Sequence, residues 1–545
     1  MQKRIMALLL AAAMATSMVA CGSTEKPAET PTTPAAPTTP AAPATPETPA
    51  EKPAEVRDTF TMAISYMPDN LKPDFASDDY TTIVRPIYDV LFAETANGLE
   101  YYLADKFEMA ADGVTYTLHI NEKATWSDGV PVTVDDIMFT DAYYLAKNGR
   151  SSYSKVSGQD VTFNKIDDKT LEIVLPVAYN YYATTLSRMP IFPSHAFDND
   201  PQKLIDDTTY YNDPAMVTSG AYTVKEINAD SIVYEARDDY YRGTPSVKTI
   251  VAKVVGAGAK EIAFENGEID YMRITTVDAL EKYSAQSDKY NIFKISESRL
   301  NYLQINPYGP AQLTDEQREA LFYAINGDEV IAGAYGSTEL AQNPNSFLTP
   351  DMTMYNPETE DYVYDLEKAK EMAKSSGLEG MTLTYIFNAD RANMEECAVV
   401  LQQQLAQIGV TLQIEGMDSS SFFNRFFALV YGSGQENTWD LGTNGWDSMR
   451  GNTLNQSYTY FNHSKNAWGM NDACAELALA VNTCADLEEA KVLADELMEV
   501  AKDEHRIYPL TYTNYVMVAQ KYVSGLDCTA VVPEFIDWMG ISVNG

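Results

Sequence analysis

A proline-rich stretch near the amino terminus divides this chain into a part that can fold and a part that cannot. Residues 22–56 hold nine prolines among alanine, threonine and glutamate, and they include no aromatic residue. Such a segment cannot bury enough apolar surface to fold, and its prolines favour extended, polyproline-like conformations. The stretch is therefore predicted to be a disordered linker, and any packed core has to come from residues 57–545.

The residues before this linker have the pattern of an export signal. Lys3 and Arg4 precede an apolar run that ends at Ala20, directly before Cys21. The run is shorter than the ~20 residues that a helix needs to cross a bilayer. Residues 1–21 resemble a bacterial lipoprotein signal peptide, whose cysteine is lipidated, although Met18 replaces the leucine most often found there. An ordinary secretory signal is the alternative, and either signal places the protein outside the cytoplasm.

Composition and missing motifs exclude several classes of function. The 78 acidic residues outnumber the 39 basic ones and give a formal charge of −39, which is the wrong sign for binding nucleic acid. The four histidines lack the spacing of a zinc site, and neither Gly-x-Ser-x-Gly nor HExxH occurs. The sequence therefore indicates no enzyme, cofactor or metal. Cys397, Cys474, Cys484 and Cys528 are predicted to be small core residues, with one disulfide allowed by export.

Hydrophobic periodicity predicts strands first and alternating helices and strands later. Strand patterns occur at 59–64, 115–120, 382–387 and 410–414, and a hairpin is predicted at 161–175. Helices are expected to carry Ile83, Ile87 and Leu91, to follow the capping box at Thr314, and to span 397–408 and 487–503. The alternation after residue 306 predicts a second α/β lobe.

One aromatic and polar segment has the composition of a ligand wall. Residues 439–450 combine two tryptophans with glycines, which let a backbone approach a ligand, and with polar side chains that orient it. The alternative interpretation is a surface loop whose tryptophans belong to the core.

Seven blocks in order resemble the extracellular solute-binding proteins of family 5, which serve ABC importers of oligopeptides, dipeptides and nickel. The blocks are residues 126–136, 219–224 with 236–243, 266–270, 300–306 with 318–326, 364–369, 401–410 and 439–446. The resemblance implies a two-lobed α/β fold like that of periplasmic binding proteins (type II, cluster C) with an extra inserted domain in lobe 1. Lobe 1 would comprise residues 57–305 plus 511–545, with the insertion at about 86–212, and lobe 2 would comprise residues 306–510.

The same resemblance implies a monomer that captures peptides or peptide-like solutes between closing lobes and delivers them to a permease with ATPase subunits. The expected ligand-binding residues are Tyr66, Tyr302, Asn306, Asn388, Asn444, Gly445, Trp446, Asp447 and Tyr512. In peptide-binding members an aspartate that clamps the ligand amine stands where this chain has Met449, so Asp447 is expected to replace it and Arg450 to meet a carboxylate. Alternatives are nickel chelates, sugars, a secreted hydrolase and a wall-surface adhesin. A lipid on Cys21 would hold the protein at the outer face of the cell membrane.

Overall fold

The computed structural model describes residues 57–73, 78–95, 98–149, 151–187, 189–350, 352, 354–428, 437–447, 469–527 and 537–544. All of them belong to one compact unit, Val56–Gly545. The predicted signal peptide with Cys21, the linker, Met449, Arg450 and Cys528 lie outside the described residues. Within this part of the chain, none of the helices combines the length and apolar character that a membrane crossing requires.

A four-stranded sheet joins the beginning of the folded unit to its middle. Its strand order is β1–β12–β11–β10, with bounds Thr59–Ile64, Thr249–Val254, Ser231–Ala236 and Tyr222–Ile227. β1 runs parallel to β12, and alternate residues of β1, beginning with Phe60, point into a core. That core also contains Trp538, Ile541 and Val543, and the Arg57 N–H donates to Asn544 Oδ1 at 2.8 Å. The two ends of the folded unit are therefore packed together.

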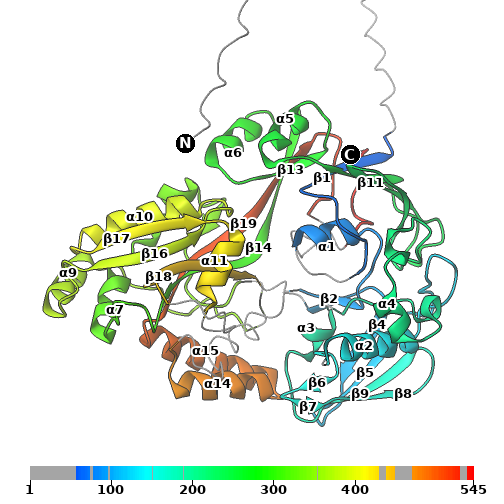
Figure 1. The fold of residues 1–545 in the computed structure, drawn as a ribbon, viewed down its shortest axis with the longest axis horizontal. Coiled ribbons are helices and arrows are strands. Elements are labelled where there is room, and N and C mark those ends of the chain that lie inside the picture. The colour runs from blue at the N-terminus through cyan, green and yellow to red at the C-terminus, as the bar shows by residue number, and fades with distance from the viewer. Residues whose placement is uncertain are drawn as a thin grey trace, which may run out of the picture. The chain divides into compact units, whose positions relative to one another are not determined.

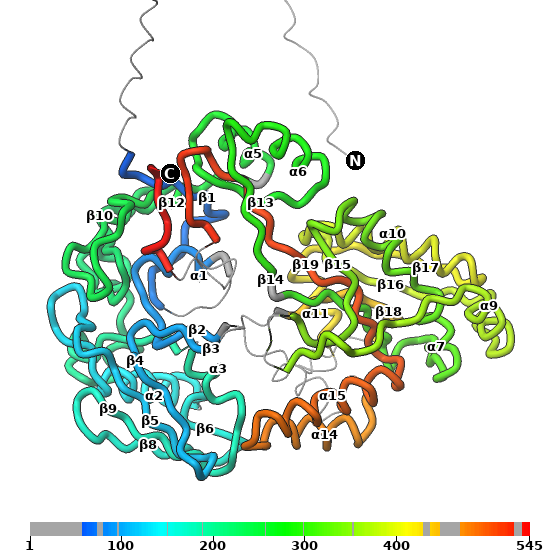
Figure 2. The backbone as a smooth tube through the Cα atoms, turned by 180° about the vertical axis from the view of Figure 1, so that it is seen from behind, coloured from blue at the N-terminus to red at the C-terminus, as the bar shows by residue number. Residues whose placement is uncertain are grey.

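A seven-stranded sheet forms the second large layer (Figure 1). Its order is β13–β19–β14–β18–β16–β17, with β15 on β19, and the bounds are Tyr271–Ile274, Ile507–Gln520, Tyr290–Ile305, Leu441–Asp447, Thr382–Asn388, Thr411–Met417 and Ala341–Gln342. The long strands β14 and β19 are antiparallel, and their register shifts between Ser296 and Arg299 and again between Asn301 and Tyr302. Figures 1 and 2 show β14 and β19 side by side across the centre of the unit.

Helices cover this sheet and follow the sequence cues closely. Their bounds are Lys260–Glu265 (α5), Val277–Ser284 (α6), Asp315–Tyr323 (α7), Gly327–Val330 (α8), Leu366–Ser375 (α9), Met394–Ala406 (α10), Ser419–Phe426 (α11), Asp472–Thr483 (α14) and Leu487–Asp503 (α15). A π-helical turn, Ile331–Tyr335, follows α8. Thr314 and Gln317 form the predicted capping box, which satisfies backbone groups at the start of α7.

A peripheral sheet region, residues 91–191, has a hydrophobic core of its own. Its main sheet has the order β4–β5–β9–β8, with bounds Ala104–Met109, Thr115–Ile120, Thr170–Val174 and Thr162–Lys165. The hairpins β2–β3 and β6–β7 and the helices α2 and α3 complete it, with bounds Phe92–Thr95, Gly98–Tyr101, Lys155–Val156, Gln159–Asp160, Val134–Asn148 and Tyr182–Ser187. Trp126 and Ile137 lie in this core. Two further helices, α1 and α4, span Asp78–Val84 and Pro201–Asp206.

The buried carboxylate of Asp89 links the segment after α1 to the segment that follows β11. Oδ2 of Asp89 accepts hydrogen bonds from the hydroxyls of Tyr240 at 2.9 Å and Tyr241 at 2.8 Å. The backbone N–H of Asp89 donates to Ser219 Oγ at 3.1 Å. Burial raises the pKa of Asp89 to about 6, although the two tyrosine hydroxyls lower it. Asp89 is therefore a group whose charge changes with pH inside a packed core.

Most predicted elements are confirmed, and the first helix is corrected. The strand at 59–64 and the helix at 487–503 have the predicted bounds. The first helix ends at Val84, so Ile87 and Leu91 are core residues outside it. Pro86 explains the early end, because a residue before proline is excluded from the helical region. The predicted ligand-wall segment contains a strand, β18, whose flanking residue Trp439 is buried.

Candidate functional site

Three neighbouring strands bring five of the predicted site residues together. Tyr302 on β14 faces Asn444 on β18, and Gly445 and Trp446 follow Asn444 on the same strand. The rings of Tyr302 and Trp446 lie 4.5 Å apart, and both side chains are buried. Tyr512 lies on β19, where it pairs with Leu300 of β14. The predicted aromatic wall is thus part of the packed centre of the sheet.

Gly445 is required by the close approach of β14. A Cβ atom at this position would lie 2.6 Å from Asn301 Oδ1 and 3.1 Å from the Leu300 carbonyl oxygen. Real Cβ atoms do not approach other atoms to 2.6 Å, so a side chain here would force the Asn301 amide to move and would crowd the Leu300 carbonyl. The missing side chain also leaves room for the Arg299 guanidinium, which lies 3.4 Å from that Cβ position.

The other predicted residues are distributed more widely. Asn306 Nδ2 donates to the Trp439 carbonyl at 2.7 Å, and Asn388 Oδ1 accepts from the Asp390 N–H at 3.1 Å. These two side chains therefore hold local structure, as does Tyr512 of the first group, whose hydroxyl donates to the Leu348 carbonyl at 2.6 Å. Tyr66 lies beyond the end of β1 with 41% of its surface exposed.

Asp447 contributes its backbone to the pairing of β18 with β14, opposite Arg299. Its side chain lies outside the described part of the structure, as do Met449 and Arg450. The expected exchange of an amine-binding role from position 449 to Asp447 therefore stays a prediction.

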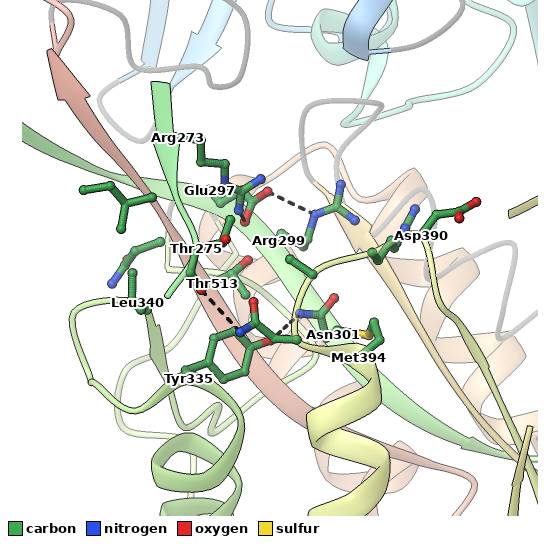
Figure 3. Close-up of a pocket in the computed structure, with 15 residues that line it drawn as sticks. Arg273, Thr275, Glu297, Arg299, Asn301, Tyr335, Leu340, Asp390, Met394 and Thr513 are labelled. Carbon is green, nitrogen blue, oxygen red and sulfur yellow. Dashed lines mark hydrogen bonds and ion pairs between the residues drawn. The ribbon is translucent and has the colours of Figure 1, made fainter. Parts of the chain in front are cut away.

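A cavity of about 260 Å³ lies beside the long paired strands β14 and β19, which we call the crossing strands. None of the nine predicted residues lines it (Figure 3). The first group of lining residues comes from β13, β14, β19 and the segments next to them, and comprises Arg273, Ile274, Thr275, Glu297, Arg299, Asn301, Thr513 and Asn514. The second group comes from the π-helical turn, the loop that follows it and the β16–α10 turn, and comprises Tyr335, Leu340, Asp390, Arg391, Ala392, Asn393 and Met394. Residues of β13, β14 and β19 thus form one side of the cavity. The π-helical turn, the loop that follows it and the β16–α10 turn form the other side.

Charged side chains dominate one wall of this cavity. Arg273 Nη2 lies 2.7 Å from Glu297 Oε2, and Arg299 Nε lies 3.5 Å from Glu297 Oε1. Burial alone would raise the pKa of Glu297, but the two guanidinium groups lower it below its usual value. Glu297 is therefore ionised at neutral pH and pairs with one arginine on β13 and one on β14, the two strands that flank β19.

The opposite wall carries a third guanidinium. Arg391 lines the cavity from the β16–α10 turn, and its Cζ atom lies 5.6 Å from the centre of the Phe423 ring. Asp390 faces the cavity from the same turn, and its Oδ2 accepts the Ser419 N–H at 2.7 Å. Among the described residues that line the cavity, three arginines thus accompany two carboxylates, Glu297 and Asp390, which is an excess of one positive charge.

Sequence reasoning missed this cluster because its members come from distant segments. Arg299 directly precedes the 300–306 block, and a pair of opposite charges inside a strand pattern, Glu297 with Arg299, was the available signal. The partners Arg273 and Thr513 become neighbours only after β13, β14 and β19 pair.

Metal and disulfide chemistry find no support among the described residues. This part of the chain contains no group of three or more histidine, cysteine, aspartate or glutamate side chains placed to hold a metal ion. The three cysteines that the structure describes are free, and Cys397 and Cys474 are buried as predicted.

Comparison with solved structures defines the class of protein. The ABC transporter substrate-binding protein CtaP of Listeria monocytogenes superposes with a TM-score of 0.80 at 26% identity, covering 90% of this chain and 100% of that one. The chain therefore has the two-lobed α/β fold of periplasmic solute-binding proteins.

Comparison of sequences gives the family. Residues 98–468 match the model of the bacterial extracellular solute-binding proteins, family 5, and the chain belongs to that family. The dipeptide-binding protein of Escherichia coli is 26% identical over 360 residues, which cover 59% of this chain and 64% of that protein. This chain thus spans less than two thirds of that relative. The oligopeptide-binding protein AppA of Bacillus subtilis is 24% identical over 460 residues, which cover 80% of each chain.

Proposed function

We propose that this protein is the receptor of an ABC importer and captures peptides or peptide-like solutes between its two lobes. Ligand contacts made only when both lobes meet would stabilise the closed form, which a permease with its ATPase subunits would then recognise. A lipid on Cys21 and the proline-rich linker would keep the receptor near that permease. Membership of family 5 and the peptide-binding names of the E. coli and B. subtilis relatives support this proposal.

The cationic cavity beside the crossing strands is the observation that carries the peptide assignment. Its volume of about 260 Å³ is below the ~300–1,000 Å³ typical of pockets for whole drug-sized ligands, so it suits one end of a longer solute. The excess of guanidinium groups over carboxylates among its described lining residues matches a carboxylate. A free peptide carries such a group at its carboxyl end.

Isothermal titration with short unmodified peptides, each paired with its carboxamide, tests this assignment. An unmodified peptide is expected to bind at least roughly tenfold more tightly than its amide, because one charge-assisted hydrogen bond contributes ~1.5–3 kcal/mol. Arg391→Gln should remove that difference. Arg425→Gln is the matched control, because Arg425 pairs with Glu415 at 2.6 Å and does not line the cavity.

The alternatives give different outcomes in the same experiments. Absence of heat and of thermal shift with all peptides would exclude the peptide hypothesis, and a nickel chelate or sugar would then be sought in mass spectra of the purified protein. Turnover of a bound solute would indicate a hydrolase. Binding of a macromolecule without contraction in X-ray scattering would indicate an adhesin.

A further inference from the structure

The peripheral sheet region contacts helix α14 through one asparagine. The Asn180 N–H donates to the Asn482 carbonyl oxygen at 2.9 Å, and Asn180 Nδ2 donates to the Val481 carbonyl oxygen at 2.8 Å. Both acceptors lie in the last turn of α14, where carbonyl groups have no partner within the helix. Asn180 therefore caps a helix that lies 301 residues further along the chain.

A second contact lies beside this cap. Gly113 is in the β4–β5 turn with φ +73°, and a Cβ atom there would lie 2.8 Å from Cβ of Ala485 in the α14–α15 turn. Figures 1 and 2 both show the end of α14 next to the peripheral sheet region. We call these five residues, Gly113, Asn180, Val481, Asn482 and Ala485, the clasp.

The clasp joins parts that the chain otherwise connects only through the crossing strands. From the peripheral sheet region the chain reaches α14 by passing along β14, and from α15 it returns to the first core along β19. A movement at the register shifts of β14 and β19 would therefore separate the two sides of the clasp. Tyr181, next to Asn180, packs into the core that contains α14 and α15, so the contact is buried as well as hydrogen-bonded.

One feature of the clasp opposes its two hydrogen bonds. The Asn482 side chain is buried, and its Oδ1 atom has no hydrogen-bond partner among the described residues. Burying an unsatisfied carbonyl oxygen costs about as much as one or two ordinary hydrogen bonds contribute. Water would satisfy this oxygen as soon as the clasp separates. The unsatisfied oxygen therefore offsets part of the stabilisation that the two hydrogen bonds and the buried Tyr181 side chain give to the clasp.

We propose that Asn180 is a positioning residue that sets the balance between closed and open forms of the ligand-free receptor. This inference rests on the proposed function, because it assumes that the two lobes open and close. The contact makes closure partly favourable before any ligand binds, and a ligand has to supply only the remaining difference.

Two substitutions are expected to move the balance in opposite directions. Asn180→Ala removes the side-chain donor and keeps the backbone donor, so the open form should gain roughly fivefold in relative population. Asn482→Leu removes the unsatisfied oxygen at similar volume, so the closed form should gain. Asn164→Ala is the matched control, because Asn164 is exposed in the same sheet region and its side chain donates to Glu172 at 3.0 Å, away from the clasp.

The full chain without ligand is the sample for both measurements. Hydrogen exchange of the segment around Asn180, corrected for intrinsic rates, should be faster in N180A and slower in N482L. The radius of gyration from X-ray scattering should rise in N180A and fall in N482L, with N164A like the unmodified protein. Unchanged exchange and size in N180A would overturn the proposal. If N180A fails to fold, unchanged values in N482L would overturn it instead. Neither measurement uses a ligand, so failure of peptide binding gives a separate result.

Discussion

Replacing Glu297 by glutamine tests whether the charged wall of the cavity stabilises the crossing strands. The Glu297 side chain is only 7% exposed and lies between Arg273, which is 36% exposed, and Arg299, which is 15% exposed. Removing one partner of a buried ion pair costs about 3–5 kcal/mol, because the remaining charge stays buried. Solvent reaches Arg273, and glutamine still accepts one hydrogen bond, so we expect a loss of about 2–3 kcal/mol.

The pH dependence gives this prediction its sign. The two arginines hold the folded pKa of Glu297 below its ordinary value of 4.5. The carboxylate therefore contributes stability above the unfolded pKa, and this contribution is lost as the pH falls through the folded pKa. The deficit of E297Q should be full at pH 7 and should shrink as the pH falls below about 4.5.

Urea unfolding followed by tryptophan fluorescence at pH 7 and at pH 3.5 measures both effects. Midpoints are compared at equal slope, because a change in slope reports a change in the surface exposed on unfolding. Glu235→Gln is the control, because Glu235 is exposed, pairs with Lys225 at 2.9 Å, and should lose less than ~1 kcal/mol. A deficit of E297Q that is below ~1 kcal/mol, or equal at both pH values, would refute the reasoning.

Three further predictions concern other parts of the chain. Gly445→Ala should lower the free energy of unfolding by about 1–3 kcal/mol, because the added Cβ atom clashes with Asn301. Gly256→Ala is the control and should change this free energy little, because a Cβ atom there meets no described atom within 4 Å. Equal losses in the two variants would contradict the close approach of the strands at Gly445. Because the folded pKa of Asp89 is raised, its stabilising contribution is lost as the pH rises from about 4 through 6, so D89N should gain about 2–3 kcal/mol relative to the unmodified protein between pH 4 and pH 7. A difference in the free energy of unfolding between D89N and the unmodified protein that stays constant across that pH range would contradict this prediction. Cys21→Ala should move the protein from the membrane fraction to the medium, and retention of the variant in membranes would disprove the lipid anchor.

Local signals in the sequence predicted individual helices and strands well, but they did not predict which distant strands pair. The capping box at Thr314 and the periodicity of residues 487–503 depend on neighbours within a few residues, and both were confirmed. Residues 439–450 were interpreted as a ligand wall from their tryptophans, glycines and polar side chains, and Gly442 and Gly445 made the strand β18 within them hard to recognise. β19 contains Pro509, and proline is tolerated in a strand only at an irregularity such as the one opposite Tyr302.

The candidate site likewise contains residues that local patterns indicated and residues that come together only when distant strands pair. The sequence indicated the residues of β14 and β18 that meet at the centre of the sheet, because each lies in a block with a recognisable order. The cavity needed Arg273, Glu297 and Thr513 to converge, and no local pattern records that β13 and β14 both pair with β19. The blocks of the family also gave the two-lobed fold, which requires only the order of elements.

The packing of both chain ends into one core has a consequence for synthesis. Phe60 of the first strand contacts Trp538, with ring centres 6.2 Å apart, and Arg57 is hydrogen-bonded to a residue 487 positions later. At ~5–20 residues per second a ribosome needs roughly 25–100 s to make that length. β1 therefore cannot complete its core until residues 538–543 have been made, and until then its apolar residues and unpaired edge are open to aggregation.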